Sequence, residues 1–280
     1  MISIITAIHN QLAMNKLFIN SLKRYTLSEY ELIIIDNNST DGSRELFEQQ
    51  GAKIIRNPQN YSYPYCQNQG IREASGEVLA FFNNDIILSQ GWDVRLLDVI
   101  GKDGHDVVSF ATIDFCRLKR ETRKYSCRWK RIKYPLLLLL GRSVFSLRLM
   151  FNLMYWKGWN RFTQKMFEKH HYEMQQGFSG SVIAMTRQGL DKIGFWDERI
   201  QSADWDTYAR CRQRHAEVGD IKPLCIISGI YIHHYQRLTL KSSRKPIVFA
   251  DQKNMMSFDD KWGKGFADHI ISKEIDAQQL

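Results

Sequence analysis

Residues 32–43 read LIIIDNNSTDGS, an aliphatic run that stops abruptly at Asp36 and continues as a polar turn. The run predicts a buried strand over Leu32–Ile35, because continuous β-branched segments of this length are typical of strands covered on both faces. The turn Asn37–Ser43 is suited to begin a helix over Arg44–Gln50. This stretch therefore predicts one strand–turn–helix unit, which is the building block of a parallel sheet.

The same alternation continues on both sides of that unit. Further strands are predicted at Ile2–Ile8, Lys53–Ile55, Val78–Phe82, Ser181–Met185 and Cys225–Ile232. Further helices are predicted at Met14–Tyr25, Cys66–Ala74, Arg187–Ile193 and Asp204–His215. Because parallel neighbours need crossover helices, this order predicts an α/β fold with a mainly parallel, Rossmann-like sheet flanked by helices.

Length and composition fit one large domain. The chain has 280 residues, of which 44% are hydrophobic and 25% charged, as expected of a protein with a real core. Its five cysteines are scattered without a CxxC pair, and no basic segment precedes the first strand. These features favour a reduced, cytoplasmic compartment and give no sign of a signal peptide.

The positive charge is concentrated in one segment. The net charge is +9, but Arg117–Lys165 holds fourteen Lys and Arg residues and a single acid, Glu121, so this segment alone carries +13 and the remainder −4. A localised excess of this kind predicts an anionic partner, such as a membrane surface, a nucleic acid or a phosphorylated substrate.

This segment is also rich in aromatic and aliphatic side chains. Tyr125 and Trp129 interleave with its basic part, and its apolar part is interrupted by Arg142 and Arg148, which makes it a poor membrane-spanning helix. We interpret Arg117–Lys165 as a basic amphipathic helical insert that lies on a membrane surface. The alternatives are an insert packed on the domain with a solvated basic face and, less favoured, a nucleic-acid-binding segment.

Polar residues follow three predicted strands at the points where they end: His9 and Asn10, then Asp36 to Ser43, then Asn83 to Asp85. Parallel sheets bind ligands at the carboxyl ends of their strands. At any single end, a solvated loop is the simpler explanation. Three such ends together favour a binding site.

Asp85 is the candidate metal ligand, because Mg²⁺ and Mn²⁺ prefer carboxylate and amide oxygens and it is flanked by Asn83 and Asn84. Taken alone, this triplet is a weak signal, since these residues are common in turns. Asp36 can accept hydrogen bonds from a nucleobase or a ribose, or it can simply cap its turn.

Two further pairs are candidates for chemistry. Asp204 and Asp206 flank Trp205 and point about 200° apart on a helix, so only one can face the crevice as a general base. The alternatives are an N-cap for Asp204 and a salt bridge from Asp206 to Arg210.

His233 and His234 end a strand and point to opposite sides, so at most one can ligate a metal or contact a diphosphate. The alternative is that these are loop histidines without a function.

Taken in order, these motifs resemble the family 2 inverting glycosyltransferases of GT-A fold. The resemblance rests on Ile2–Asn10, Leu32–Ser43, Asn57–Asn60, Asn68–Glu77, Val78–Asp85, Gly177–Ser181, Gly194–Glu198, Ala203–Asp206, His233, Phe258 and Lys261–Gly263. It covers roughly residues 1–90 and 177–263, and the run ending at Ser43 is its most specific part.

The resemblance implies transfer of a sugar, with inversion, from a nucleotide diphosphate donor, UDP or dTDP, to a hydroxyl of a glycan or lipid-linked acceptor in cell-surface polysaccharide synthesis. It implies Asp204 as catalytic base, Gly180 and Trp205 on the acceptor side, and Mn²⁺ or Mg²⁺ held by Asp85 and His233. The donor-binding residues that it implies are Ala7, His9, Asn10, Asp36, Asn38, Ser39, Asn60, Asn68, Asn83 and Asn84.

The sequence departs from the family's pattern in three places. Asn83 stands where the metal motif often has Asp, and Ala203 where the acidic motif often has an acid. Arg117–Lys165 has no counterpart among the motifs. The predicted division is a catalytic domain over 1–235, with a nucleotide-sugar half (1–115), the insert (117–165) and an acceptor half (170–235), followed by a tail over 236–280 packed on it.

Two alternatives remain from the sequence. A nucleotidyltransferase also needs a nucleotide-binding α/β fold and a carboxylate-bound metal, but no Gly-rich, Lys-bearing phosphate loop follows the first strand. A degenerate GT-A fold could serve only as a binding module. The expected location is the cytoplasm, with peripheral contact to the cytoplasmic face of the membrane through 117–165.

Overall fold

The computed structural model describes residues 1–236 and 248–266. Its main sheet has eight strands in the order β3-β2-β1-β4-β8-β6-β9-β7. In chain order these are β1 (Ile2–Ile8), β2 (Tyr30–Asn37), β3 (Lys53–Asn57), β4 (Val78–Phe82), β6 (Val107–Ala111), β7 (Met174–Gln176), β8 (Val182–Thr186) and β9 (Cys225–Tyr231). A second, two-stranded sheet pairs β5 (Ile86–Ile87) with β10 (His233–His234).

The sheet is parallel in its first half and mixed in its second. β3, β2, β1 and β4 run parallel, so their carboxyl ends lie at one edge. β8 runs antiparallel to both β4 and β6, and β9 is parallel to β6. The α/β, mainly parallel prediction is confirmed, with four parallel pairings against three antiparallel ones, counting β7 with β9.

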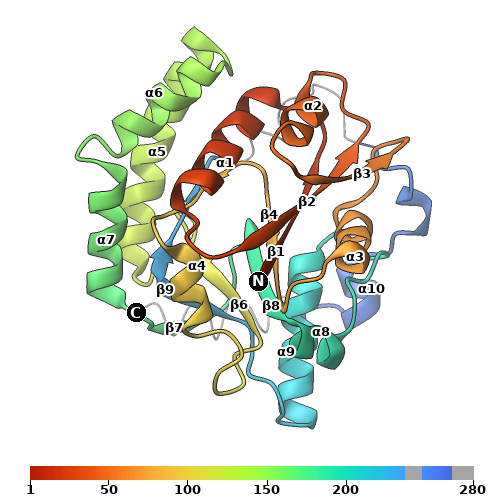
Figure 1. The fold of residues 1–280 in the computed structure, drawn as a ribbon. Coiled ribbons are helices and arrows are strands. Elements are labelled where there is room, and N and C mark those ends of the chain that lie inside the picture. The colour runs from red at the N-terminus through yellow and green to blue at the C-terminus, as the bar shows by residue number, and fades with distance from the viewer. Residues whose placement is uncertain (237–247, 267–280) are drawn as a thin grey trace.

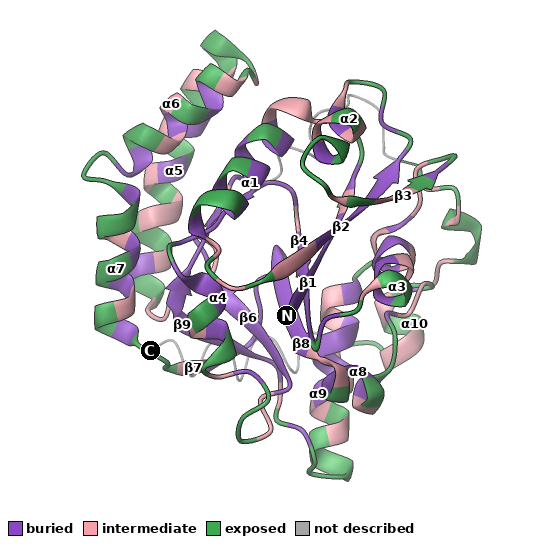
Figure 2. Cartoon of the chain, viewed as in Figure 1, coloured by how far each residue is buried: buried purple, intermediate pink, exposed green. Residues whose placement is uncertain are grey.

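Helices cover both faces of the sheet (Figure 1). One face packs against α1 (Leu12–Tyr25), α2 (Ser43–Glu48) and α4 (Trp92–Leu97), and the other against α3 (Tyr63–Glu73), α8 (Arg187–Ile193) and α9 (Ala203–Glu217). The strands are buried almost throughout (Figure 2), as their aliphatic composition predicts. α3 lies so close to β1 that a β-carbon at Gly70 would clash with Ile5, which explains the glycine.

The segment predicted as a basic helical insert forms three helices: α5 (Lys119–Leu140), α6 (Val144–Met154) and α7 (Trp159–His170). α7 packs on β9, and α5 pairs with α6, which also touches α1. Trp129, Tyr155 and Trp159 are buried in the main core. Part of this segment is therefore packed on the domain, as the second interpretation expected.

The predicted elements occur in the structure at nearly the predicted bounds, and β1, β4 and α8 match them residue for residue. The strands β5, β6 and β7 and the helices α4 and α10 (Phe258–Trp262) were not predicted from the sequence. Beyond the gap at 237–247, residues 248–266 include a short 3₁₀ turn (Gln252–Asn254) and α10. The part of the predicted tail over 237–247 and 267–280 lies outside the described residues.

Candidate active site

The carboxyl ends of β1 and β2 are tied together by their loops. The backbone N–H of Asn10 donates to Oγ of Ser39 (2.8 Å), and the N–H of Thr40 donates to Oδ1 of Asn10 (2.8 Å). Asn10 and Asn38 have positive φ angles of 58° and 61°, which asparagine tolerates better than most residues. The asparagines of these two turns therefore set the shape of the sheet edge.

Asp36 is fully buried below this edge. Its Oδ1 accepts a hydrogen bond from the Ser39 N–H (2.9 Å), and its Oδ2 forms an ion pair with Nε of Arg44 (2.6 Å). The structure thus shows the turn-capping alternative. Direct contact between Asp36 and a nucleobase stays a prediction, and it requires this carboxylate to become accessible.

Two asparagines predicted to bind the donor are bonded within the protein. Both amide atoms of the buried Asn68 are bonded to the loop before α9: Nδ2 donates to Glu198 Oε1 (2.8 Å), and Oδ1 accepts from the Trp196 N–H (3.0 Å). Nδ2 of the buried Asn84 donates to Oδ1 of Asn15 on α1 (2.6 Å). Both side chains are oriented by these bonds, and their contact with a donor stays a prediction.

Of the remaining predicted donor residues, Ser39 is buried, where its Oγ accepts the Asn10 N–H, and the others reach the surface at the sheet edge. His9 and Asn38 are exposed, and Ala7, Asn10, Asn60 and Asn83 are partly exposed. The backbone carbonyl of Asn37 accepts a hydrogen bond from Nδ1 of His9 (2.7 Å), which leaves Nε2 of the ring available as an acceptor. This partly exposed set, rather than the buried one, lies where a ligand can contact it.

Asp85 lies beside His234, not His233. β10 pairs with β5 so that His234 is opposite Ile86, which places its Nε2 3.4 Å from Oδ1 of Asp85. Its Nδ1 is 3.1 Å from Oδ2 of Asp114. Burial lowers the pKa of His234, but Asp85 and Asp114 outweigh that effect and raise the pKa to about 10. In the absence of a metal, this histidine is a cation between two carboxylates.

His233 faces the opposite way, as strand alternation requires. It is fully buried among aromatic rings, with its centroid 4.5 Å from that of Trp129, and its Nδ1 is 3.0 Å from the hydroxyl of Tyr155. Burial holds the pKa of His233 well below its usual range. In the described part of the chain, no carboxylate contacts His233 among these rings, and Asp85 lies beside His234 instead. Which of the two histidines ligates a metal stays a prediction.

The residues at this position fit a hard divalent cation in part. Asp85 and Asp114 supply carboxylate oxygens and His234 an imidazole, which are ligand types that Mn²⁺ accepts. No group of three or more His, Cys, Asp or Glu side chains is preformed for a metal within 1–236 and 248–266. A cation here would therefore depend on ligand oxygens in addition to those of the protein.

Asp204 lies on the other side of the β4 end. It is in the first turn of α9, and its Oδ2 lies so close to Gly180 that any β-carbon there would clash with it. Nδ2 of Asn83 donates to the Gly180 carbonyl (3.4 Å), which joins the same turn to β4. Burial raises the pKa of the Asp204 carboxyl to about 7. This value is that of a group able to exchange a proton near neutral pH.

The two aspartates of the first α9 turn have different surroundings. Asp206 is fully buried and bonded to Arg210 Nε (2.8 Å), Lys261 Nζ (2.6 Å) and Trp262 Nε1 (2.9 Å). The salt-bridge alternative for Asp206 is thus seen, while the cap alternative for Asp204 is not, because Ser202 is the N-cap residue. Trp205 is half-buried and packs edge-on against Phe178, with ring centroids 4.7 Å apart.

Sequence reasoning missed several residues that shape the site. They are Asn15, Arg44, Asp114 and Tyr63, whose pKa is raised by burial and by nearby Asp204. The signal for Asp114 was present, since it follows the aliphatic run Val107–Ala111 just as Asp85 follows β4. Arg44 and Asn15 lie on helices and became informative only once their partners across the loop were known.

Comparisons with known proteins agree with this fold. The sheet and its helices match those of GT-A glycosyltransferases of known structure. GalNAc-T7 with UDP, GalNAc and Mn²⁺ gives a TM-score of 0.54 at 15% identity, covering 83% of this chain and 43% of that one. The mannosyltransferase PcManGT of Pyrobaculum calidifontis, with GDP-Man and Mn²⁺, gives 0.50 at 13% identity, covering 80% and 56%.

The sequence profile of glycosyl transferase family 2 matches residues 3–164, more than half of the chain, and the chain belongs to this family. It is 30% identical over 115 residues to the glycosyltransferase AglE of Haloferax volcanii, a match that covers 38% of each chain. The match thus spans well under half the length of that relative. The profile match also runs through most of the segment predicted as an insert.

Proposed function

We propose that the protein is a metal-dependent inverting glycosyltransferase. It would transfer a sugar from a nucleotide diphosphate donor, UDP or dTDP, to a hydroxyl of a glycan or lipid-linked acceptor in cell-surface polysaccharide synthesis. The observation that carries the proposal is the position of Asp204: a carboxylate with a pKa of about 7 that lies over Gly180, beside the end of the strand that leads to Asp85.

Asp204 would act as the general base. Deprotonated, it accepts the proton of an acceptor hydroxyl as the hydroxyl oxygen attacks the anomeric carbon of the donor. A base that works from the side opposite the leaving nucleotide gives inversion in one displacement. Because Gly180 lacks a side chain, the acceptor can approach the Asp204 carboxylate over the turn that Asn83 holds.

The donor would lie along the edge formed by β1, β2 and β4. Its nucleoside would contact the exposed His9 and Asn38 and the partly exposed Asn10, and its diphosphate would extend towards Asp85. Asp85 and His234 would hold Mn²⁺ or Mg²⁺ there together with diphosphate oxygens. When bound, the cation would neutralise charge that develops on the leaving nucleotide.

The neighbours support this class of donor. PcManGT is in complex with GDP-Man and Mn²⁺, and GalNAc-T7 with UDP, GalNAc and Mn²⁺. These ligands belong to those proteins, and they support a nucleotide diphosphate and a divalent metal here without selecting a base or a sugar. The donor panel below identifies the base and the sugar.

The test is nucleotide release from a panel of UDP-, dTDP- and GDP-sugars with Mn²⁺, with and without EDTA. We expect slow, metal-dependent release from one donor, lost in Asp85→Ala and in Asp204→Asn once an acceptor is supplied. The matched control is Asp220→Asn. Asp220 is an exposed carboxylate that follows α9 and pairs with Arg214 in the last turn of that helix. Donor titration by calorimetry accompanies the panel. Absence of both release and binding would contradict the proposal, and release of pyrophosphate from a nucleoside triphosphate would favour a nucleotidyltransferase.

A further inference from the structure

The helix α5 has two opposite faces of different character. Glu121, Tyr125, Trp129 and Lys133 recur every four residues and point into the protein. The other face is formed by residues that lie within about 40° of one line along the helix. In order along the chain they are Arg120, Lys124, Cys127, Arg131, Tyr134 and Leu138. We call this line of side chains the α5 stripe.

The α5 stripe is cationic at one end and apolar at the other. Its residues are all exposed, and no ion pair joins Arg120, Lys124 or Arg131 to an acid in the described part of the chain. At its far end, Leu138 is 86% exposed and its neighbour Leu139 76%. A helix of 22 residues is about 33 Å long, so the two kinds of surface are well separated along it.

The apolar end is a concentrated patch. The turn from α5 to α6 exposes Leu138, Leu139, Leu140 and Phe145, and we call these four residues the hairpin tip. The hairpin tip projects beyond the sheet at the upper left of Figure 1 and is exposed in Figure 2. Seven of the fifteen large hydrophobic side chains that are exposed in the described part lie within residues 134–156. Contiguous exposure of this kind marks an interaction site rather than ordinary surface.

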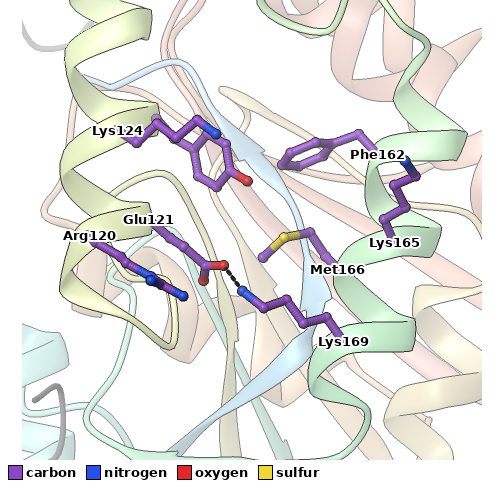
Figure 3. A pocket seen from close by; sticks show the side chains of 8 residues that line it. Arg120, Glu121, Lys124, Phe162, Lys165, Met166 and Lys169 are labelled. Atoms are coloured by element: carbon purple, nitrogen blue, oxygen red, sulfur yellow. Dashed lines mark hydrogen bonds and ion pairs between the residues drawn. The ribbon is translucent and has the colours of Figure 1, made fainter.

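A groove between α5 and α7 extends the cationic surface. It has a volume of about 450 Å³, and Arg120, Lys124, Lys165 and Lys169 line it (Figure 3). Its one acid, Glu121, is already paired with Lys169, as the dashed line in Figure 3 shows. The groove therefore keeps an excess of positive charge that suits phosphate groups.

We propose that α5 lies along an anionic lipid bilayer, with the hairpin tip inserted among the acyl chains and the α5 stripe against the headgroup phosphates. Charge complementarity selects this partner, because a purely apolar protein partner leaves the cations unpaired and a nucleic acid leaves the leucines exposed to water. Tyr134 lies one turn before the tip on α5, and its ring is of a kind that favours the membrane interface. No helix in residues 1–236 or 248–266 is long and apolar enough to cross a membrane, so contact by this helix pair is at the surface.

This docking adds a partner to the proposed function, since a lipid-linked acceptor lies at such a surface, but its test needs neither donor nor acceptor. The full chain is sedimented with vesicles of phosphatidylcholine alone and of phosphatidylcholine with 30% phosphatidylglycerol, at low and high salt. We expect binding to the anionic vesicles that weakens with salt. Donor titration on the same variants reports separately on the crevice.

Two pairs of variants separate the contributions. Leu138→Glu with Phe145→Glu should weaken binding by at least about tenfold, because each inserted apolar side chain is lost from the membrane. The matched control is Leu27→Glu with Val218→Glu, whose side chains are 62% and 58% exposed elsewhere. Arg120→Glu with Arg131→Glu should weaken binding by about tenfold and reduce its salt dependence. Its control is Lys102→Glu with Lys264→Glu.

Three results would overturn the proposal. The first is wild-type protein that stays in solution with anionic vesicles. The second is a tip variant that binds like wild type but loses a dimer in light scattering, which would make the tip a subunit interface. The third is binding of a duplex RNA or DNA oligomer that depends on Arg120 and Arg131 in the absence of vesicle binding, which would make the stripe a nucleic-acid site.

Discussion

The strand-end edge of the sheet and the helix pair α5–α6 differ in how their side chains are used. At the strand-end edge, polar side chains bond to one another: Asp36 to Arg44, Asn68 to Glu198, and Asn84 to Asn15. In the helix pair, leucines stay exposed at the tip. The strand-end edge is thus held in one arrangement by internal bonds, whereas the helix pair leaves apolar surface unused within the fold.

The largest effect is expected at Asp204, whose carboxylate forms no ion pair within residues 1–236 and 248–266. Asp204→Asn keeps the shape of the side chain but removes the base, and we expect kcat to fall by about 10²–10⁴ because a general base contributes that much. Steady-state kinetics with the donor found by the release panel measures this. Donor affinity and vesicle binding should be unchanged. A rise in KM with kcat unchanged would assign Asp204 to positioning of the substrate rather than to proton transfer.

A second prediction contrasts the packed and exposed sides of the helical segment. Trp129→Ala should lower the free energy of unfolding by about 3–5 kcal/mol, because Trp129 is fully buried against His233 and Tyr235. Trp156→Ala is the matched control: this ring is 68% exposed, so its loss should cost less than about 0.5 kcal/mol. Urea unfolding followed by circular dichroism measures both. Equal losses would mean that the segment does not pack as described.

The two adjacent histidines provide a third prediction. His234→Gln should raise the Mn²⁺ concentration needed for half-maximal nucleotide release by about 10- to 100-fold, because loss of one group in a metal's coordination environment usually lowers its affinity that much. His233→Phe keeps a ring in the aromatic cluster and should leave the Mn²⁺ dependence unchanged while altering thermal stability. If His233→Phe raises the required Mn²⁺ concentration as much as His234→Gln does, the proposal that His234 rather than His233 ligates the metal is contradicted.

The histidine pair also shows where sequence reasoning ends. Alternation along a strand dictates that His233 and His234 point to opposite sides, but only the pairing of β10 with β5 decides which one meets Asp85. The same limit applies to the asparagines. Their presence after strands predicted where the strands end. Whether an amide faces a ligand or a neighbouring helix depends on contacts between residues far apart in the chain, as Asn84 and Asn15 show.

The fold itself was more predictable, because long aliphatic runs have few alternatives in a chain of this composition. β1 and β4 have the predicted bounds. The missed elements were short: β6 and α4 have five and six residues, and a run of that length does not distinguish a strand from a helix. In the helical segment, composition indicated both packing and surface contact, and only the structure assigns them to opposite faces of α5.

The pH dependence of activity provides a fourth prediction. The pKa of Asp204 is about 7, and the base works only when deprotonated. The rate should therefore fall about tenfold for each pH unit below 7 and level off above it. A profile of kcat/KM from pH 5 to 9 measures this. A rate that is flat down to pH 5 would show that Asp204 has an ordinary pKa or is not the base.

The smallest effect concerns stability and has the opposite sign from the effect on activity. A carboxyl whose pKa is higher in the folded than in the unfolded state favours folding only while it is protonated. For Asp204 this contribution is complete below about pH 4 and is lost as the pH rises to about 7. Asn carries no charge, so Asp204→Asn should gain stability relative to wild type over that range. A shift of about three pKa units is worth roughly 4 kcal/mol in full, but Asp204 is only partly buried, so we expect about 1–2 kcal/mol at pH 8 and little at pH 4. Thermal unfolding of both proteins at the two pH values measures the difference. A variant that is less stable than wild type at pH 8 would mean that ionised Asp204 has a stabilising partner in the fold. The inactive but more stable variant expected here would show that the fold holds this carboxylate at a cost in stability.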